Sequence, residues 1–466
     1  MENIFQFIDV LPEVNLDRND TEQQIFTKYF NTINQNMLKE ILNLKPEIMK
    51  NIELSEKCRM KGNLHYRAKN YTVAMTFYVI GLRQAPRDST EYALTIANRS
   101  AECLVDIERV FKSEYPKDML YKIYMRQAKC YLELKCYGKA SKAAQNAKTS
   151  FETAKVTLNK KVSELIAEKI KDIERCLENH LDTDTTVNDE EQPSFPVLTA
   201  GENPSFAYAS NAVAMRKNKQ SGRHVVASVD IKKGDVLFVE EPYSTDVLLF
   251  SETYFKYCSE CFTSSLTCIP CTSCFMLVFC SDECRQLHWD TRHRWECAAV
   301  RRSVISKELS LALGVLFRVS HTGFNTIIPD ARVYGNKTDN YPYVNQLMTH
   351  KNNIPQETYT GYVKAAACLV VYLIHFTDYF EWLYARYNRP AGSREELHRM
   401  VGGLLLKFLS QNGTNKDIIN NTFVARADKY DIGLKRNQLA CALYVSSSAL
   451  NHACLPNTVK RSVCIL

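Results

Sequence analysis

Glycine and tryptophan are scarce in this chain, which has only 15 glycines and three tryptophans among 466 residues. Long apolar stretches are absent as well. The longest run, Ala365 to Phe376, is too short to cross a bilayer and contains His375, so we expect a buried helix there. The opening segment MENIFQFIDV lacks the basic and then apolar parts of a secretory signal. We therefore expect no membrane partner and a cytoplasmic or nuclear protein.

A strong excess of one charge is also lacking. The formal net charge is +7, and basic residues form only short local runs such as Arg216 to Lys219 and Arg292 to Arg294. This balance disfavours nucleic acid as a partner. Hydrophobic residues at 45% and charged residues at 24% are typical of globular proteins, and the length predicts about three domains.

Cysteine, by contrast, is abundant, with 17 residues. In a long chain without a secretory signal these cysteines indicate zinc sites and free thiols rather than disulfides. Potential ligands between residues 258 and 297 stand in close pairs, as expected when a short turn must aim two ligands at one zinc ion about 2.3 Å away. The pairs are Cys258 with Cys261, Cys271 with Cys274, Cys280 with Cys284, and His293 with Cys297, the last pair at positions i and i+4 of a helix.

These eight ligands make two tetrahedral sites, and we favour an interleaved arrangement. The first pair then shares an ion with the third, and the second pair shares an ion with the fourth. The sequence does not prove this pairing. Cys268 is a ninth candidate because it has the same spacing to Cys271, but choosing it would leave Cys274 without a partner.

A cluster of ordinary buried thiols is the alternative to zinc. A segment of about forty residues with few large aliphatic side chains cannot fold unaided, which favours the metal. The order and spacing of the ligands resemble a MYND zinc finger, including the His288-Trp289 step before the last pair. Such a finger is a closed site that binds partners and performs no chemistry.

A repeat runs through the mostly helical segment from Glu56 to about Cys176. Small, aromatic and proline residues recur at the offsets of a tetratricopeptide (TPR) unit, and three helix pairs are about the minimum for a stable stack. One unit contains Gly62, Ala74, Tyr78, Gly81 and Pro86, another contains Ala128, Tyr131, Ala140, Ala144 and Ala147, and a degenerate unit, LTIANRSAECL, lies between them. An unrelated helical bundle is the alternative.

The character of the chain changes after the repeats. The acidic segment HLDTDTTVNDEEQPSFP lacks the apolar residues of a core and predicts a linker. Residues 225–249 then predict two or three strands joined by a tight hairpin at Lys232 to Asp235. After the finger, the chain to about residue 425 predicts an irregular, mostly helical segment.

The segment ALNHACLPNT, from Ala449 to Thr458, gives the strands and the finger a common interpretation. Together they resemble the SET- and MYND-domain (SMYD) family, in which a MYND finger splits a SET methyltransferase domain and Asn-His-x-Cys-x-Pro-Asn is the SET signature. SGRHVVASVDIKKGDVLFVEEPY is similar to the first SET segment. The TPR region is similar to the fourth-member type of the family, and the resemblance covers most of residues 56–458.

The resemblance implies an α+β multidomain fold. The expected domains are an N-terminal helical extension (1–55), TPR-like helical repeats (56–178), an acidic linker (179–204), the first SET segment (205–257), the MYND finger (258–297), a helical insert (298–425) and an incomplete second SET segment (426–466).

The resemblance also implies methyl transfer from S-adenosylmethionine to a lysine of a protein substrate. The matching cofactor positions are Ser221, Gly222, Arg223, Asn451 and His452, with a further asparagine expected in the insert, for which we choose Asn412 over the rival register Asn421. The target amine must be neutral, although its unperturbed pKa is about 10.4. It must also approach the methyl group in line, so the domain acts chiefly by positioning.

Two departures from the family pattern bear on the enzyme prediction. His224 stands where a second glycine of a Gly-x-Gly cofactor loop is expected. The family's catalytic tyrosine and cysteine-rich segment would lie beyond Leu466, so Cys454 lacks its usual co-ligands and we expect no third zinc.

The alternative function is a non-catalytic adaptor, in which the TPR and MYND surfaces recruit partners and the SET part is a scaffold. A nucleic-acid-binding zinc protein is disfavoured because Cys2His2 spacing is lacking.

The repeats also contain a candidate peptide site. Some TPR domains bind the acidic C-terminal tail of a cytosolic heat-shock chaperone through a clamp of basic and amide side chains, and the residues in those positions here are Arg59, Asn63, Asn98, Lys122 and Arg126. Arg59 replaces the usual lysine, and bidentate pairing of arginine with a carboxylate makes this exchange compatible with the clamp. Solvated surface residues are the alternative.

Overall fold

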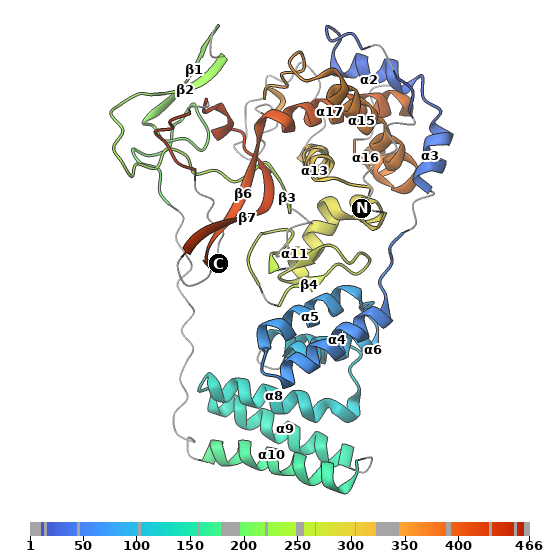
Figure 1. The fold of residues 1–466 in the computed structure, drawn as a ribbon, viewed down its shortest axis with the longest axis vertical. Coiled ribbons are helices and arrows are strands. Elements are labelled where there is room, and N and C mark those ends of the chain that lie inside the picture. The colour runs from blue at the N-terminus through green and yellow to red at the C-terminus, as the bar shows by residue number, and fades with distance from the viewer. Residues whose placement is uncertain are drawn as a thin grey trace.

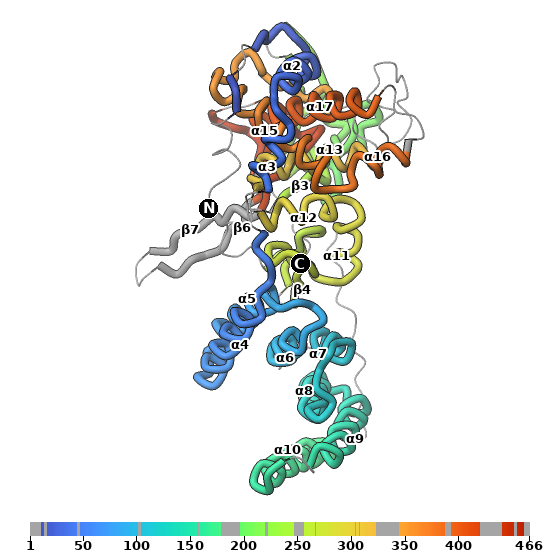
Figure 2. The backbone as a smooth tube through the Cα atoms, turned by 90° about the vertical axis from the view of Figure 1, so that its right-hand side faces the viewer, coloured from blue at the N-terminus to red at the C-terminus, as the bar shows by residue number. Residues whose placement is uncertain are grey.

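The computed structural model is elongated, with three parts along its longest axis (Figure 1). Repeat helices form one end, a second group of helices with most of the strands forms the other, and the finger lies between them in both views (Figures 1 and 2). The structure describes residues 11–13, 16–43, 47–100, 104–155, 158–178, 196–219, 222–247, 256–265, 267–302, 304–322, 344–387, 393–427, 431–451 and 454–460, with Lys307, Tyr387 and residues 420–439 described by their backbone alone.

The helices between residues 52 and 178 form consecutive packed pairs. The pairs are α4 (Ile52–Arg67) with α5 (Tyr71–Gln84), α6 (Thr90–Arg99) with α7 (Leu104–Phe111), and α8 (Leu120–Glu133) with α9 (Tyr137–Ala154). The 3-10 turn η2 (Lys117–Met119) precedes α8, and α10 (Lys160–Glu178) packs along α9. Small residues occupy the contacts. Gly62 lies against the ring of Tyr78, and Ala128 and Ala140 are fully buried. Small side chains at these positions allow the paired helices to approach closely.

Two turns in this region are nearly identical. Lys69 (φ 62°) and Lys135 (φ 56°) both adopt the left-handed conformation after a helix. In each turn the next residue, Asn70 or Cys136, donates its N–H to the carbonyl five residues earlier at 2.9 Å. This bond closes a helix C-terminus in the Schellman manner. The recurrence of the same closure after α4 and α8 indicates an internal repeat.

A second group of helices surrounds the largest apolar core. Its members are α2 (Glu22–Phe30), α3 (Gln35–Asn43), α13 (Lys307–Thr322), α15 (Gln356–Phe376), α16 (Tyr379–Tyr387) and α17 (Arg394–Asn415). A capping box between Thr21 and Gln24 starts α2. This helix then crosses α17 so closely that a Cβ on Gly403 would lie 2.7 Å from the Cα of Gln23. The N-terminal extension therefore packs directly on the helical insert.

Helix α15 is the central helix of this core. By length and composition it could cross a membrane, but 67% of its most apolar window is buried inside the protein. Val370 and Leu373 are fully buried, and the Tyr372 hydroxyl donates to the Trp295 carbonyl at 2.8 Å. The buried helix predicted for the longest apolar run is therefore present.

The strands pair differently from the sequence prediction. β1 (Val213–Asn218) pairs with β2 (Gly222–Ala227), whereas β7 (Asp431–Leu443) pairs with both β3 (Ser244–Val247) and β6 (Lys416–Ala427), all antiparallel. The predicted hairpin across Lys232 to Asp235 is wrong. The turn exists, with Gly234 at φ 102°, but the segment after it bonds back to Thr199 and Tyr208, and β2 pairs with β1 instead.

The helical insert is also shorter than expected. The prediction extends helix to residue 425, whereas α17 ends at Asn415 and β6 begins at the next residue. The sequence of β6, KDIINNTFVARA, is rich in β-branched residues. Such residues favour strands, and β6 pairs with β7 along its whole length through one of its edges.

The strand-rich segments on either side of the finger join into one unit. Ser244 pairs with Leu443, and the N–H of Tyr243 donates to the carbonyl of Leu443 at 2.7 Å. Ala449 packs in the small apolar cluster that contains Val225. The chain before the finger and the chain after the insert therefore form the two halves of a single interrupted fold.

Candidate metal centre and cofactor region

Short secondary-structure elements place the finger ligands. A hairpin of β4 (Ile269–Pro270) and β5 (Val278–Phe279) leads directly into Cys271 and Cys280. The following helical stretch consists of α11 (Asp282–His288), the π-helical turn η5 (Trp289–His293) and α12 (Arg294–Arg301). Ser281 caps α11 by accepting the N–H of Cys284 at 3.2 Å. This cap fixes a ligand in the first turn of the helix.

The eight candidate ligands gather into two clusters, with the interleaved pairing favoured from the sequence. One cluster contains Cys258, Cys261, Cys280 and Cys284, the other contains Cys271, Cys274, His293 and Cys297, and within each the ligand atoms lie within 4.8 Å of one another. Cys280 Sγ lies 3.6 Å from both Cys261 Sγ and Cys284 Sγ. A tetrahedral zinc site with bonds of about 2.3 Å has sulfur–sulfur edges of about 3.8 Å. Cys268 is buried but belongs to neither cluster.

The second cluster has a similar geometry around an imidazole. His293 Nε2 lies 3.3 Å from Cys271 Sγ and 3.5 Å from Cys274 Sγ. The backbone N–H of Ser273 also donates to Cys271 Sγ at 3.4 Å, as expected for a thiolate held in a tight turn. All four ligands of this cluster are buried.

The chemistry of the sulfurs fits a divalent metal. The Cys258 thiol lowers the pKa of Cys261 to about 4, and the same contact raises the pKa of Cys258. Sulfurs this close cannot all be anionic without a cation between them. A zinc ion removes the conflict by holding every cysteine as a thiolate. Because both clusters have four protein ligands, the sites are closed and suit a structural rather than a catalytic role.

Cationic side chains surround the second cluster, and the sequence analysis did not find them. Arg301 Nη1 donates to Cys297 Sγ at 3.2 Å, and Arg301 also pairs with Glu47 at 2.8 Å. Lys50 Nζ donates to the Arg83 carbonyl at 3.0 Å, and burial lowers the pKa of Lys50 to about 8. Such outer contacts orient ligands and offset thiolate charge. No sequence motif marks them because they come from three separate segments of the chain.

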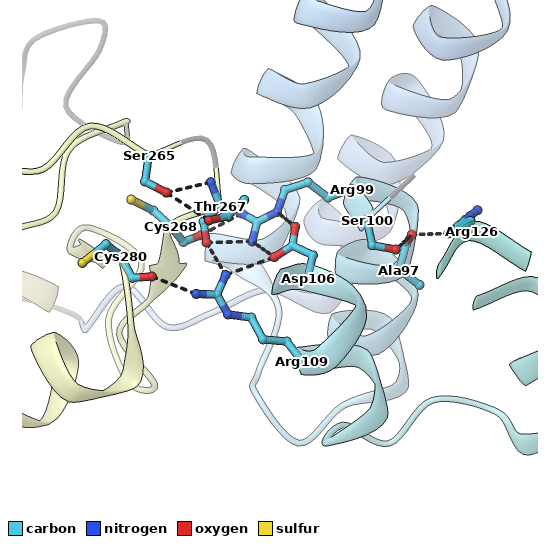
Figure 3. A network of polar contacts seen from close by, with 10 residues as sticks. All are labelled: Ala97, Arg99, Ser100, Asp106, Arg109, Arg126, Ser265, Thr267, Cys268 and Cys280. Atoms are coloured by element: carbon cyan, nitrogen blue, oxygen red, sulfur yellow. Dashed lines mark hydrogen bonds and ion pairs between the residues drawn. The ribbon is translucent and has the colours of Figure 1, made fainter. Parts of the chain in front are cut away.

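Arginines of the repeats bind the backbone of the finger (Figure 3). Arg99 and Asp106 are fully buried and form a bidentate pair at 2.6 and 2.8 Å. The same guanidinium donates to the Cys268 carbonyl at 2.7 Å, while Arg109 donates to the Cys280 carbonyl at 2.8 Å and pairs with Asp106 at 3.0 Å. The repeats and the finger are therefore joined by a buried polar interface.

On its other side, the finger is fixed to the SET-like strands by Arg292 in η5. Its Nη1 donates to the Thr245 carbonyl in β3 at 2.7 Å, and its Nε donates to Glu296 at 2.8 Å. Asp246 lies beside it and accepts from Ser310 Oγ at 2.8 Å. Burial raises the pKa of Asp246 to about 7, although the neighbouring arginine opposes the shift.

Gly222 and Arg223 are the candidate cofactor residues described in the first strand-rich segment. Gly222 has φ 60°, and no atom lies within 4 Å of the position that a Cβ would take. Arg223 Nη2 donates to the Gln346 carbonyl at 2.7 Å. The same turn, residues 344–347, accepts two bonds from Gln411 Nε2, at 2.9 and 3.0 Å. This turn therefore connects the first SET-like segment to the end of α17.

Asn412, next to Gln411, is the most unusual polar residue of this region. Its side chain is 1% exposed, yet neither its amide nitrogen nor its amide oxygen has a hydrogen-bond partner within the described part of the chain. Buried amides without partners are rare, so this amide requires a ligand or water. The rival Asn421 lies in β6 opposite Asn437, with only its backbone described.

The remaining cofactor candidates are only partly described. Asn451 is exposed and follows the 3-10 turn η7 (Ser447–Ala449), whereas Ser221 and His452 lie outside the described residues.

Glu240, which the sequence analysis did not single out, holds the backbone of the residues that precede Asn451. Its partly buried carboxylate accepts the N–H groups of Val445, Ser446 and Ser447 at 2.7, 2.7 and 2.9 Å.

The five clamp candidates divide into two groups. Asn63 and Asn98 meet, with Asn98 Nδ2 donating to Asn63 Oδ1 at 2.9 Å, and Arg126 donates to the Ala97 carbonyl nearby. Burial, followed by the charge of Arg126, lowers the pKa of Lys122. Arg59 is instead held in a bidentate pair by the buried carboxylate of Glu91, at 2.7 and 2.9 Å. Its guanidinium is therefore already occupied within the protein.

Comparison with known proteins agrees with this architecture. A model of the MYND finger family matches residues 258–297, the segment that forms the two clusters. The chain is 28% identical over 274 residues to a Pongo abelii protein named protein-lysine N-methyltransferase SMYD4, covering 51% of this chain and 33% of the relative. The Gallus gallus SMYD4 protein is 29% identical over 298 residues, covering 56% and 38%. The Danio rerio SMYD4 protein is 23% identical over 464 residues, covering 89% of this chain and 55% of the relative.

The chain is therefore similar to SMYD4 proteins and contains a segment that matches the MYND finger family. It spans from a third to about half of the length of the SMYD4 proteins that it matches. A match over 89% of this chain, as with the Danio rerio protein, extends across both the helices before the finger and the finger itself.

Proposed function

We propose that this chain carries the S-adenosylmethionine-binding part of a protein-lysine N-methyltransferase. The observation that supports this most is the unpartnered, buried amide of Asn412, whose chain neighbour Gln411 binds the turn that also accepts a hydrogen bond from Arg223. The relatives named as protein-lysine N-methyltransferases support the same reaction class. The open space beside Gly222 would allow a ligand to approach the backbone there.

The residues of this chain would bind and orient the cofactor. S-adenosylmethionine, when bound, supplies an activated methyl group. Asn412 offers an NH2 group as donor and a carbonyl oxygen as acceptor from a buried position, and Glu240 holds the backbone that leads to Asn451. Rigid placement of this kind allows a neutral lysine amine of a substrate protein to approach in line.

Removing the Asn412 amide is expected to weaken cofactor binding. Calorimetric titration of the purified chain with S-adenosylmethionine should give saturable binding, and Asn412→Ala should weaken it by about tenfold or more because one or two buried hydrogen bonds are lost. The exposed Asn352→Ala is the matched control and should bind like the original chain.

The outcomes of this titration separate the alternatives. If Asn421→Ala, rather than Asn412→Ala, abolishes binding, the other register holds the cofactor. If the unaltered chain binds no S-adenosylmethionine at all, the enzyme proposal fails. The non-catalytic adaptor, in which repeats and finger recruit protein partners, then remains.

For partners, we propose that the repeats bind an acidic C-terminal peptide such as the tail of a cytosolic heat-shock chaperone. The Asn63–Asn98 pair, with Lys122 and Arg126, offers amide and cationic groups of the kind that recognise carboxylates. Arg59 contributes to the fold instead, because Glu91 already neutralises it. A cytoplasmic location follows from such a partner.

Arg126→Ala is expected to weaken binding of an acidic C-terminal peptide by about tenfold, since a charge-assisted hydrogen bond is lost. Calorimetry with the peptide and with the same peptide amidated at its C-terminus measures the effect. The exposed Arg67→Ala is the control and should leave the affinity unchanged. Equal affinity of the Arg126 variant and the unaltered chain would exclude this site.

A further inference from the structure

At the interface between repeats and finger, arginine side chains bind mainly backbone carbonyls. Within the described residues, Arg83 Nε donates to the Phe275 carbonyl at 2.6 Å, and Arg99 and Arg109 both donate to the Thr267 carbonyl. With the bonds to Cys268 and Cys280, the repeats contact four carbonyls of the finger. Backbone carbonyls carry no sequence information, so this recognition depends on the path of the finger loops.

Those loops depend on the metal sites. Cys280 is itself a ligand, Phe275 follows the ligand Cys274, and Thr267 precedes the β4 strand that leads into Cys271. The buried cluster of the finger consists of Cys258, Ile269, Cys271, Cys274, Leu277, Phe279 and Cys297. Most of these residues are zinc-binding candidates, so the finger has little apolar core to hold its loops in place without metal.

The arginine side of the interface is already organised. Asp106 binds Arg99 and Arg109 together, and Arg99 and Asp106 are fully buried. The two guanidinium groups therefore present their remaining N–H donors in a fixed direction. When the finger separates, these donors would exchange the finger carbonyls for water, so docking depends on carbonyls that are held in matching positions.

We propose that metal loading of the finger controls the docking of the helical repeats. The repeats bind the finger when zinc fixes the loops that contain Thr267, Cys268, Phe275 and Cys280, and they separate from it when zinc is lost. Coupling of this kind is reciprocal, so docked repeats also strengthen zinc binding by the same factor. This inference does not depend on the proposed methyltransferase function.

The test compares zinc retention and repeat docking in the full chain. In competition with a chromogenic chelator, Arg109→Ala should lose zinc at about tenfold lower chelator concentration, because it removes the bonds to Thr267 and Cys280. Arg175→Ala is the matched control, since Arg175 lies in α10 and pairs with Glu168 and Asp172 of the same helix. Its zinc retention should equal that of the unaltered chain.

Hydrogen exchange gives the second readout. Removing zinc from the unaltered chain should raise amide exchange across α6 and α7, while α9 and α10, which lie away from the finger, remain protected (Figure 2). If Arg109→Ala loses helicity, Arg87→Ala replaces it, because Arg87 is partly exposed and pairs with Asp282 at the rim. Zinc retention equal to that of the control, or unchanged exchange after zinc removal, would overturn the proposal.

Discussion

Replacement of Cys274 by serine is expected to lower the zinc content from two ions per chain to one and to unfold most of the finger. Cys274 is one of four buried ligands of its cluster, and a serine hydroxyl is a poor zinc ligand. Structural zinc contributes on the order of 10–16 kcal/mol of binding free energy, which in a small finger is folding free energy. Elemental analysis and thermal unfolding measure the two effects.

The chain provides a close control for this experiment. Cys268 is as buried as the ligands of the second cluster and lies in the same finger, but it belongs to neither cluster. Burial raises the pKa of Cys268 to about 12, so it is a neutral thiol. Cys268→Ser should retain two zinc ions. Loss of an ion in this variant, or full zinc content in Cys274→Ser, would contradict the assigned ligand sets.

Replacement of Asp106 by asparagine is expected to destabilise the repeats by about 3–5 kcal/mol. The substitution keeps the size of the side chain and removes the charge that compensates Arg99, which is fully buried. The guanidinium then remains as an uncompensated charge among the helices. The loss should be visible as a lower midpoint of the first unfolding transition monitored by far-ultraviolet circular dichroism.

An exposed ion pair in the same domain serves as the comparison. Asp172 pairs with Arg175 at 2.8 Å, but both side chains are more than half exposed. Exposed pairs of this type typically contribute less than about 1 kcal/mol. Asp172→Asn should therefore leave the transition nearly unchanged. If the two variants shift it equally, the Arg99–Asp106 pair does not hold the interface as described.

The metal centre is the part that the sequence predicts best, because zinc ligation imposes a local rule. A turn that aims two sulfurs at one ion fixes the spacing of Cys258 and Cys261 or of Cys271 and Cys274. The helical repeats are predicted for a similar reason, since small residues such as Gly62 must recur wherever helices pack closely. Both signals lie within short stretches of chain.

The sequence does not predict which distant segments of the chain pair or dock with one another. The turn at Lys232 to Asp235 forms, but which strand pairs with β2 depends on β1, and the local pattern does not specify that partner. The local pattern also does not specify the change from helix to strand after Asn415, because that change depends on pairing with β7. The docking of Arg99 and Arg109 was missed because an arginine that binds a distant carbonyl has no sequence signature.

The pairing of β3 with β7 also affects how the protein is made. Val247 cannot pair until its partner in the sheet, Ala440, has been synthesised, and these residues are separated by the whole finger and the helical insert. At translation rates of about 5–20 residues per second, this delay is on the order of 10–40 s. During that time the edge of β3 has no sheet to join, while the repeats and finger can already fold. Nascent chains should therefore depend on protection from aggregation until the last strands emerge.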